Sequence, residues 1–359
     1  MTSSKKDRNL AIDFLRILAI VAVVTIHTTT KILDMSHFNI LSTPVSFYLN
    51  QAARFAVPLF FLISGFVLEY NYKENFKYAT FFKRRAARII VPYLVWSIFY
   101  LFVVNNYSLT NFGSPDSVMS LLSDLLVGGA SYQLYFIPSL AVFYIFFPVL
   151  HRYVRLLSNR YILFILGGVE FVLLAQDYYI GTLGISKPLR IVLLSYFMFF
   201  IGMYASVGHD SLYLFARKYT KPLLFGIVLL SALVTVQSGS LYLGSHNTGF
   251  IYEQYRPDVY VLTLLIFVVS FTLSRYATLF RPYIITISHL SYFVFFVHVF
   301  ILEVVWQYGE GAFFSSYIAG RGMFADASFS LFFTCSVCFL SFLLAYIFHK
   351  IPKLSSITG

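Results

Sequence analysis

The chain has 359 residues, of which 59% are hydrophobic, 20% are aromatic and 11% are charged, whereas soluble domains carry about 25% charged residues. So few charges cannot cover a soluble surface on a chain with 41 Phe and 28 Tyr, so the composition indicates an integral membrane protein and excludes cytosolic, DNA-binding and disulfide-scaffold classes. The formal net charge of +11 therefore reports membrane topology and contact with anionic lipid rather than affinity for nucleic acid.

A transmembrane helix needs about 20 apolar residues. Ten apolar runs approach or exceed this length, and the loops between them hold no linker, internal repeat or separate soluble domain. We therefore predict an all-α integral membrane protein in which residues 1–359 form one bundle of about ten helices, with its core at 9–350. The predicted spans are 9–30, 47–70, 86–104, 133–150, 161–176, 188–207, 221–237, 257–274, 284–306 and 327–348.

The positions of Lys and Arg predict the orientation of the bundle. Loops on one side contain 19 of the 26 Lys and Arg residues, and two arginines, Arg16 and Arg54, lie inside spans. Because cytoplasmic loops are enriched in Lys and Arg, that side and both termini are predicted to be cytoplasmic. The first span is too long for a cleavable signal and carries charges, so it is expected to remain as a helix. The other side holds Lys31, Lys187, Arg190, Arg256 and Arg321.

Three ionisable residues of the first span, Asp13, Arg16 and His27, lie on roughly one stripe. The eleven residues from Arg16 to His27 make close to whole turns and extend about 16 Å along the axis. An ionisable group at bilayer depth costs several kcal/mol unless it is paired or hydrated, so each is a functional candidate. The structural alternative is an anchoring ion pair between Asp13 and Arg16, with His27 bonded to a neighbouring helix.

The second span carries Arg54 near its outer end, followed by the apolar stretch Val57-Pro58-Leu59-Phe60-Phe61-Leu62-Ile63-Ser64-Gly65-Phe66. An uncompensated arginine at this depth is expensive. We expect Arg54 to reach the end of the first span where His27 lies, or to bind an anionic or oxyanionic group.

The loop that leads into the third span is strongly basic and reads Lys83-Arg84-Arg85-Ala86-Ala87-Arg88, with Pro92 just beyond. Such a cluster is typical of a stop-transfer segment attracted to anionic lipid. The functional alternative is a phosphate clamp, because Arg85 and Arg88 share a helical face and guanidinium groups bind phosphate bidentately. The phosphate could belong to a nucleotide, a lipid headgroup or coenzyme A.

The ninth span contains Ser288-His289-Leu290-Ser291-Tyr292 and then His298 about half-way through the membrane. A histidine at this depth either satisfies a contact between helices or takes part in chemistry. Glu170 in the fifth span and Glu303 in the ninth carry the same two alternatives, and the sequence assigns a partner to neither.

No motif supports metal or phosphate-loop chemistry. The sequence contains no Walker loop, HExxH or GxSxG, and its carboxylates are too dispersed to propose a metal site. Cys335 and Cys338 form a CxxC inside an apolar span without a second pair, so we expect packing rather than zinc binding or redox chemistry.

Taken in order, these motifs resemble the membrane-bound acyltransferase 3 family over residues 9–350. The arginine just before Val-Pro-Leu-Phe-Phe makes the chain look most similar to the branch with enterobacterial common antigen acetyltransferases and the intercellular adhesion proteins of biofilm polysaccharide loci. Tyr135 stands where many members have tryptophan. The matching motifs are Arg16 and His27 with ten residues between them, Phe60 to Phe66 ending in Ser-Gly-Phe, Arg85-Ala86-Ala87-Arg88 with Pro92, the aromatic region Leu134 to Pro148 with Tyr144, and Ser291-Tyr292 to His298.

The resemblance implies an acyltransferase of the bacterial plasma (inner) membrane, multi-pass, that moves an acetyl or succinyl group from cytoplasmic acyl-CoA. The implied acceptor is a hydroxyl of a cell-envelope or extracellular glycan, or of its lipid-linked precursor. Acyl-CoA, the glycan and membrane lipids are the expected partners, with no nucleic acid and no metal. The acceptor's identity and the acyl chain are left open. Outer loops near 31–46, 105–132, 238–256 and 307–326 are expected to shape the acceptor site.

The resemblance also implies roles for individual residues. His27 would be the general base on the acceptor hydroxyl, or a transient acyl carrier, because its ordinary pKa near 6.5 suits either role. Arg54 would stabilise the oxyanion. Asp13 and Arg16 would position the donor or lock the first helix. Residues expected to hold the coenzyme are Arg16, Arg84, Arg85 and Arg88, and further candidates are Tyr144, Ser291, Tyr292 and His298.

The competing hypothesis is a transporter or flippase for a polysaccharide or lipid-linked sugar. A helix bundle that buries Arg54, Glu170 and His298 would also fit that function. Such transporters are expected to show inverted repeats or paired broken helices at the membrane midplane, and the sequence shows neither.

Overall fold

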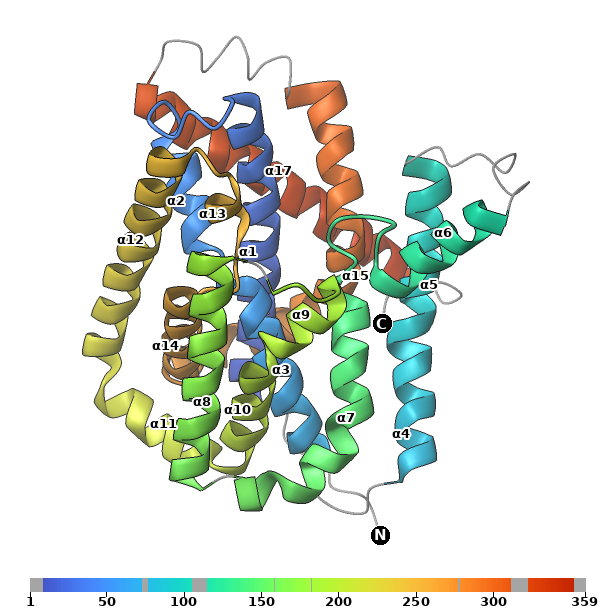
Figure 1. Ribbon diagram of the computed structural model, residues 1–359, viewed down its shortest axis with the longest axis vertical. Coiled ribbons are helices and arrows are strands. Elements are labelled where there is room, and N and C mark those ends of the chain that lie inside the picture. Colours follow the sequence, from blue (N-terminus) through green and yellow to red (C-terminus); the bar gives the residue numbers. More distant parts are fainter. Residues whose placement is uncertain are drawn as a thin grey trace.

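The computed structural model describes residues 9–72, 77–104, 115–157, 159–181, 183–276, 278–310 and 322–351, which form helices and no strand (Figure 1). Nine helical stretches within these ranges are long and apolar enough to cross a membrane, and one bent pair of helices raises the number to ten. The prediction of an all-α bundle of about ten spans is confirmed. Residues 1–8 and 352–359 lie outside the described ranges, so the side on which the termini lie stays a prediction.

The first half of the bundle contains seven α-helices in the described ranges: α1 (Leu10–Met35), α2 (Pro44–Ala52), α3 (Ala56–Asn71), α4 (Tyr78–Arg85), α5 (Val91–Phe99), α6 (Pro115–Val127) and α7 (Phe136–Leu157). The second half contains α8 (Arg160–Ala175), α9 (Lys187–Leu193), α10 (Tyr196–Val207), α11 (His209–Lys218), α12 (Thr220–Ser245), α13 (Gly249–Tyr252), α14 (Pro257–Tyr276), α15 (Arg281–Val305) and α17 (Gly322–Lys350). Short π-helical segments, η1 (Ala86–Ile90), η2 (Tyr100–Val104), η4 (Gln176–Ile180) and η6 (Trp306–Glu310), continue four of the spans, and a 3-10 turn, η5 (Thr278–Phe280), precedes α15.

Helix α1 runs through the interior of the bundle, where it packs against α2, α3, α14, α15 and α17 (Figure 1). Its first turn is capped by Asn9, whose side-chain oxygen accepts a hydrogen bond from the Ala11 N–H at 3.0 Å. Protein surrounds most of the helix, and this is the environment that a polar stripe requires in a membrane.

Helices α3 and α10 touch backbone to backbone. A Cβ atom added to Gly65 would lie 1.9 Å from the Phe199 carbonyl oxygen, and one added to Gly202 would lie 2.0 Å from the Leu62 carbonyl oxygen. Small residues permit this close approach of membrane helices. The glycine of the Ser-Gly-Phe motif therefore serves helix packing.

The second predicted span, 47–70, is broken into α2 and α3, and Arg54 lies in the three-residue break between them. The N-terminus of α2 is held by a buried carboxylate from α17. Asp326 accepts hydrogen bonds from the N–H groups of Val45 and Ser46 at 2.7 and 3.0 Å, and also from the Ser46 hydroxyl. An acidic side chain at this position stabilises a helix N-terminus.

The predicted span 188–207 is also broken, since α9 and α10 meet at an angle of 42°. The break frees backbone groups that side chains then satisfy. The Tyr260 hydroxyl donates to the Leu194 carbonyl oxygen, and the Glu170 carboxylate accepts from the Phe197 N–H at 3.3 Å. This contact gives Glu170 a structural partner that the sequence did not assign.

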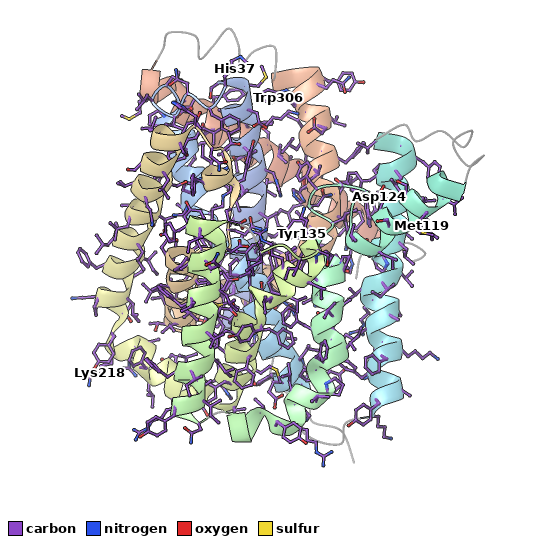
Figure 2. All side chains as sticks on the ribbon, in the orientation of Figure 1. His37, Met119, Asp124, Tyr135, Lys218 and Trp306 are labelled. Carbon is purple, nitrogen blue, oxygen red and sulfur yellow. The ribbon has the colours of Figure 1, made fainter. Side chains whose placement is uncertain are left out.

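Three labelled side chains mark the two ends of the bundle. Figure 2 places Lys218 at one end and His37 with Trp306 at the other. On α17, Cys335 is exposed and Cys338 is half-buried, so only Cys338 has the packing role predicted for both.

Candidate active site

Two cavities lie along α1. The basic cavity has a volume of about 410 Å³ and is bordered by Arg16 on α1. The histidine cavity has a volume of about 680 Å³ and is bordered by His27 further along the same helix. One helix therefore supplies a polar side chain to each cavity.

The basic cavity collects most of the predicted donor-site residues. Helices α1, α7 and α15 and the α4–η1 junction bring them together from four distant segments of the chain. No Asp or Glu is among the described residues that border it, whereas three arginines are, so its wall is basic. The candidates that border the basic cavity are Arg16, Arg85, Arg88, Tyr144, Ser291 and Tyr292.

Arg85 lies among aromatic rings within this wall. Its guanidinium carbon is 5.8 Å from the centre of the Tyr72 ring, 5.7 Å from that of Phe81 and 5.6 Å from that of Tyr144. Its Nε is buried and has no hydrogen-bond partner within the described ranges. An arginine held by its face against rings keeps its N–H groups for an anion.

Arg88 reaches the same cavity from the π-helical segment η1, whereas Arg84 does not. The wider π-turn changes the register of the helix just after Arg85, and such turns are frequent at functional sites. Arg84 is exposed and borders neither cavity. The structure therefore brings together two of the three arginines predicted from the basic loop.

Asp13 lies apart from both cavities. Its side chain is buried, with 2% exposed, and accepts a hydrogen bond from the Ser288 hydroxyl of α15 at 2.8 Å. This bond ties α1 to α15. The position matches the helix-locking alternative for Asp13 and gives the carboxylate no access to the histidine cavity.

His27 borders the histidine cavity, and the fully buried His298 lies beside it without bordering the cavity. Their ring centres are 5.3 Å apart, and the Tyr132 ring centre is 4.9 Å from that of His27. The Nδ1 of His298 donates to the Val294 carbonyl oxygen at 3.0 Å. That tautomer leaves a lone pair on the buried Nε2, which has no hydrogen-bond partner among the described residues.

Arg54 borders the same cavity and is 3% exposed. Its Nη1 donates to the Tyr252 carbonyl oxygen at 2.7 Å and its Nη2 donates to Asn50 Oδ1 at 2.5 Å. Its Nε is buried without a hydrogen-bond partner in the described part of the chain. Both partners are neutral, so the positive charge of Arg54 is oriented but not cancelled by an ion pair.

Further charges around the histidine cavity were not recognised as site residues from the sequence. Lys31 pairs with Glu303 at 2.8 Å, which supplies the partner that the sequence left open for Glu303. Arg190 bridges two carboxylates, those of Asp177 and Glu253. The signal in the sequence that could have identified them was the number of charged residues at the outer ends of the apolar spans. Which of these residues form ion pairs depends on which helices are neighbours.

Tyrosines complete the wall of the histidine cavity. The Lys187 ammonium lies 4.6 Å from the centre of the Tyr135 ring, and the Tyr135 hydroxyl accepts from Gln254 Nε2 at 2.9 Å. Tyr252 donates to Asp34 at 2.6 Å.

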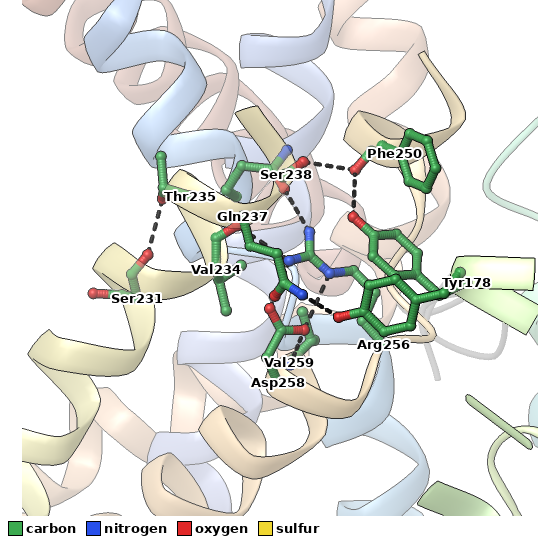
Figure 3. Close-up of polar contacts among 12 residues, drawn as sticks. Tyr178, Ser231, Val234, Thr235, Gln237, Ser238, Phe250, Arg256, Asp258 and Val259 are labelled. Atoms are coloured by element: carbon green, nitrogen blue, oxygen red, sulfur yellow. Dashed lines mark hydrogen bonds and ion pairs between the residues drawn. The ribbon is translucent and has the colours of Figure 1, made fainter. Parts of the chain in front are cut away.

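Behind Arg54, a second arginine holds three helices together. Arg256, which the sequence assigned to an outer loop, is fully buried and donates to Asp258 at 2.6 Å and to the Val234 carbonyl oxygen at 3.1 Å (Figure 3). Its Nη1 donates to Gln51 Oε1 at 3.1 Å, and its guanidinium carbon lies 4.7 Å from the Tyr178 ring centre. Arg256 is thus a structural residue and not a marker of topology.

Three of the predicted acceptor loops contribute described residues to the border of the histidine cavity. These residues are Lys31 and Asp34 from loop 31–46, Tyr132 from loop 105–132, and Gly249 and Tyr252 to Tyr255 from loop 238–256. Residues 105–114 and 311–321, which belong to two of the predicted loops, lie outside the described ranges.

Comparisons with known proteins identify relatives of the whole chain. A family model described as an acyltransferase domain matches residues 9–350. Proteins of Staphylococcus aureus strains MRSA252 and MSSA476, each named a probable poly-beta-1,6-N-acetyl-D-glucosamine export protein, are 24% identical over 323 residues, which cover 84% of this chain and 85% of theirs. No solved structure matches the chain.

Proposed function

Since the chain belongs to the acyltransferase 3 family of membrane proteins, we propose that it transfers an acyl group from acyl-CoA to a hydroxyl of a glycan or lipid-linked glycan in the cell envelope. The observation that carries this proposal is the arrangement of α1, which borders the basic cavity with Arg16 and the histidine cavity with His27. Eleven residues of α-helix separate these side chains by about 16 Å along the axis.

The basic cavity suits the phosphates of coenzyme A. Arg16, Arg85 and Arg88 border it without an opposing carboxylate in the described part of the wall. Phosphate oxygens would accept charge-assisted hydrogen bonds from these guanidinium groups. The thioester end of the donor would then extend along α1 towards His27.

The histidine cavity supplies groups for acyl transfer to an alcohol. His27 takes the proton of the acceptor hydroxyl while the hydroxyl oxygen bonds to the thioester carbonyl carbon. Arg54 stabilises the negative charge that develops on the carbonyl oxygen. The carbon–sulfur bond then breaks, and the coenzyme thiolate receives the proton from His27. His298 places a second nitrogen base beside His27.

The wall of the histidine cavity also suits a sugar. Tyr132, Tyr135 and Tyr252 present aromatic surface and hydroxyls, and Gln133 and Gln254 add amides. Apolar faces with a few placed polar groups are typical of ligand sites. The names of the S. aureus relatives mention an N-acetylglucosamine polymer, so a β-1,6-linked N-acetylglucosamine oligosaccharide is a reasonable first acceptor to test.

The test is transfer of radiolabelled acetyl and succinyl groups from their coenzyme A thioesters to that oligosaccharide by protein reconstituted in lipid nanodiscs. We expect transfer by the wild type and a loss of about 100-fold or more in His27→Ala, in line with the removal of a general base. His37→Asn is the matched control, because His37 is exposed, borders neither cavity and has a positive φ of 50° that asparagine accepts. Full activity in His27→Ala would reject the assignment of the base.

Export of a polysaccharide is a second candidate function, because the S. aureus relatives carry that name. It predicts that proteoliposomes move the oligosaccharide across the bilayer in the absence of any acyl-CoA. Acyl transfer predicts no such movement and a strict requirement for the donor, so the same protein preparation separates the two functions.

A further inference from the structure

The basic cavity and the histidine cavity have three bordering residues in common, and all three are phenylalanines. Phe60 comes from α3, Phe136 from the start of α7 and Phe295 from α15. The ring centres of Phe60 and Phe136 are 5.8 Å apart and those of Phe136 and Phe295 are 5.7 Å apart. We call this cluster the aromatic partition.

The aromatic partition lies next to the proposed base. The ring centre of Phe295 is 6.3 Å from that of His298, which in turn lies 5.3 Å from that of His27. A group that enters the histidine cavity from the basic cavity therefore meets phenylalanine rings just before it reaches the histidines. The rings offer no hydrogen bond and no charge to that group.

A fourth phenylalanine contacts the partition but borders neither cavity. The Phe61 ring centre lies 4.9 Å from that of Phe136 and 5.3 Å from that of Phe143. Phe61 is fully buried and borders neither cavity. It therefore matches Phe136 in residue type and neighbourhood without reaching the path between the cavities.

We propose that Phe60, Phe136 and Phe295 select the acyl group, admitting a short uncharged acyl chain to His27 and rejecting longer or charged ones. This inference rests on the proposed acyl transfer and names the class of donor. A carboxylate, as in a succinyl chain, would lose its hydration among the rings without gaining a partner there, which is costly. A longer alkyl chain would require the rings to separate, and closely packed interiors resist such expansion. Acetyl satisfies both conditions.

The experiment compares acetyl-, butyryl-, hexanoyl- and succinyl-CoA as donors for the wild type and for Phe136→Leu, Phe295→Leu and Phe60→Leu. In the wild type we expect transfer to fall in the order acetyl, butyryl, hexanoyl, with succinyl disfavoured. Each partition variant should raise the hexanoyl-to-acetyl ratio of kcat/KM by about tenfold or more, since differences of a few methylenes in an apolar site have effects of this size. Phe61→Leu, the matched control, should leave the ratio within about twofold.

Two further readouts separate selection from general loosening. Binding of acetyl-CoA, measured by calorimetry, should be unchanged in the partition variants, because the proposed phosphate contacts lie in the basic cavity. Hydrolysis of acetyl-CoA without acceptor should rise, because smaller side chains admit water to the thioester. Three variants on three helices keep the test possible if one of them fails to fold.

The outcomes are distinguishable. An unchanged acyl preference in all three variants, or an equal rise in Phe61→Leu, would overturn the partition proposal while leaving acyl transfer intact. A wild type that prefers succinyl or hexanoyl over acetyl would overturn it as well. A folded wild type that transfers no acyl group from any thioester would reject the proposed function and the partition with it.

Discussion

The basic cavity and the histidine cavity both contain arginine, but they treat its charge in opposite ways. Arg85 lies among three rings in a wall whose described residues include no carboxylate. Around the histidine cavity, Arg190 and Lys31 are matched by acidic partners, and Arg54 alone of these is held by neutral oxygens. Charge that is paired stabilises the fold. Under the proposed function, Arg85 and Arg54 would instead bind the donor and stabilise the oxyanion.

The sharpest test of the comparison is removal of charge from the basic cavity. Arg85→Ala/Arg88→Ala should weaken acetyl-CoA binding by about 100-fold or more, because each charge-assisted hydrogen bond contributes about 1.5–3 kcal/mol. Calorimetry measures the affinity. Arg84→Ala, which alters an exposed neighbour outside the cavity, should keep it, and equal losses in both variants would show that only overall charge matters.

Removal of the oriented arginine should act on rate rather than on donor affinity. Arg54→Lys, which keeps the charge but loses the geometry of the guanidinium, should lower kcat by about 100-fold, as expected when an oxyanion donor is lost. The affinity for acetyl-CoA should stay within about twofold of the wild type. A drop in donor affinity with unchanged kcat would place Arg54 on the donor side of the site instead.

Substitution of the paired arginine Arg256 should lower the stability of the protein without changing its binding of acetyl-CoA. Arg256→Met removes the fully buried partner of Asp258, whose side chain is 16% exposed, and breaking a buried ion pair costs at most about 3–5 kcal/mol. Thermal unfolding in detergent should therefore begin at a lower temperature than in the wild type. The protein that remains folded should bind acetyl-CoA normally, whereas Lys218→Met, at the surface end of α11, should leave both quantities unchanged.

The smallest effect is expected at the edge of the histidine cavity. Lys31 and Glu303 have side chains that are 27% and 40% exposed, and exposed pairs contribute about 0–1 kcal/mol. Glu303→Gln should lower the melting temperature only slightly. If the KM for the oligosaccharide rises while the KM for acetyl-CoA is unchanged, this pair belongs to the acceptor site; an equal rise in both would place it outside that role.

The spans and the polar stripe on α1 could be predicted from the sequence, because both depend only on the order of residues within a short segment. Apolar runs identify spans, and helical spacing put Arg16 and His27 on one stripe. The sequence did not predict that Glu170 would accept a hydrogen bond at the α9–α10 break, or that Arg256 would be buried with Asp258 as its partner. It also did not predict that Arg84 would lie apart from Arg85 and Arg88. These outcomes depend on which helices become neighbours and on a π-turn at η1, neither of which leaves a periodic signal.

The aromatic partition could not be predicted from the sequence either, although Phe60 lies in the motif Phe60 to Phe66. A chain with 41 Phe offers many candidates. Only the positions of α3, α7 and α15 distinguish the three phenylalanines that border both cavities from Phe61, which is adjacent in sequence to Phe60.

The backbone contact between α3 and α10 has a mechanical consequence. Gly65 and Gly202 each lie against a backbone carbonyl of the other helix. Because no side chains separate the two backbones there, we expect α3 and α10 to move together as one rigid unit. Helices α4 and α7 and the segment η1 line other parts of the basic cavity. Hydrogen exchange should accordingly be slow along α3 and α10, and we expect any response to acetyl-CoA in α4, η1 and α7.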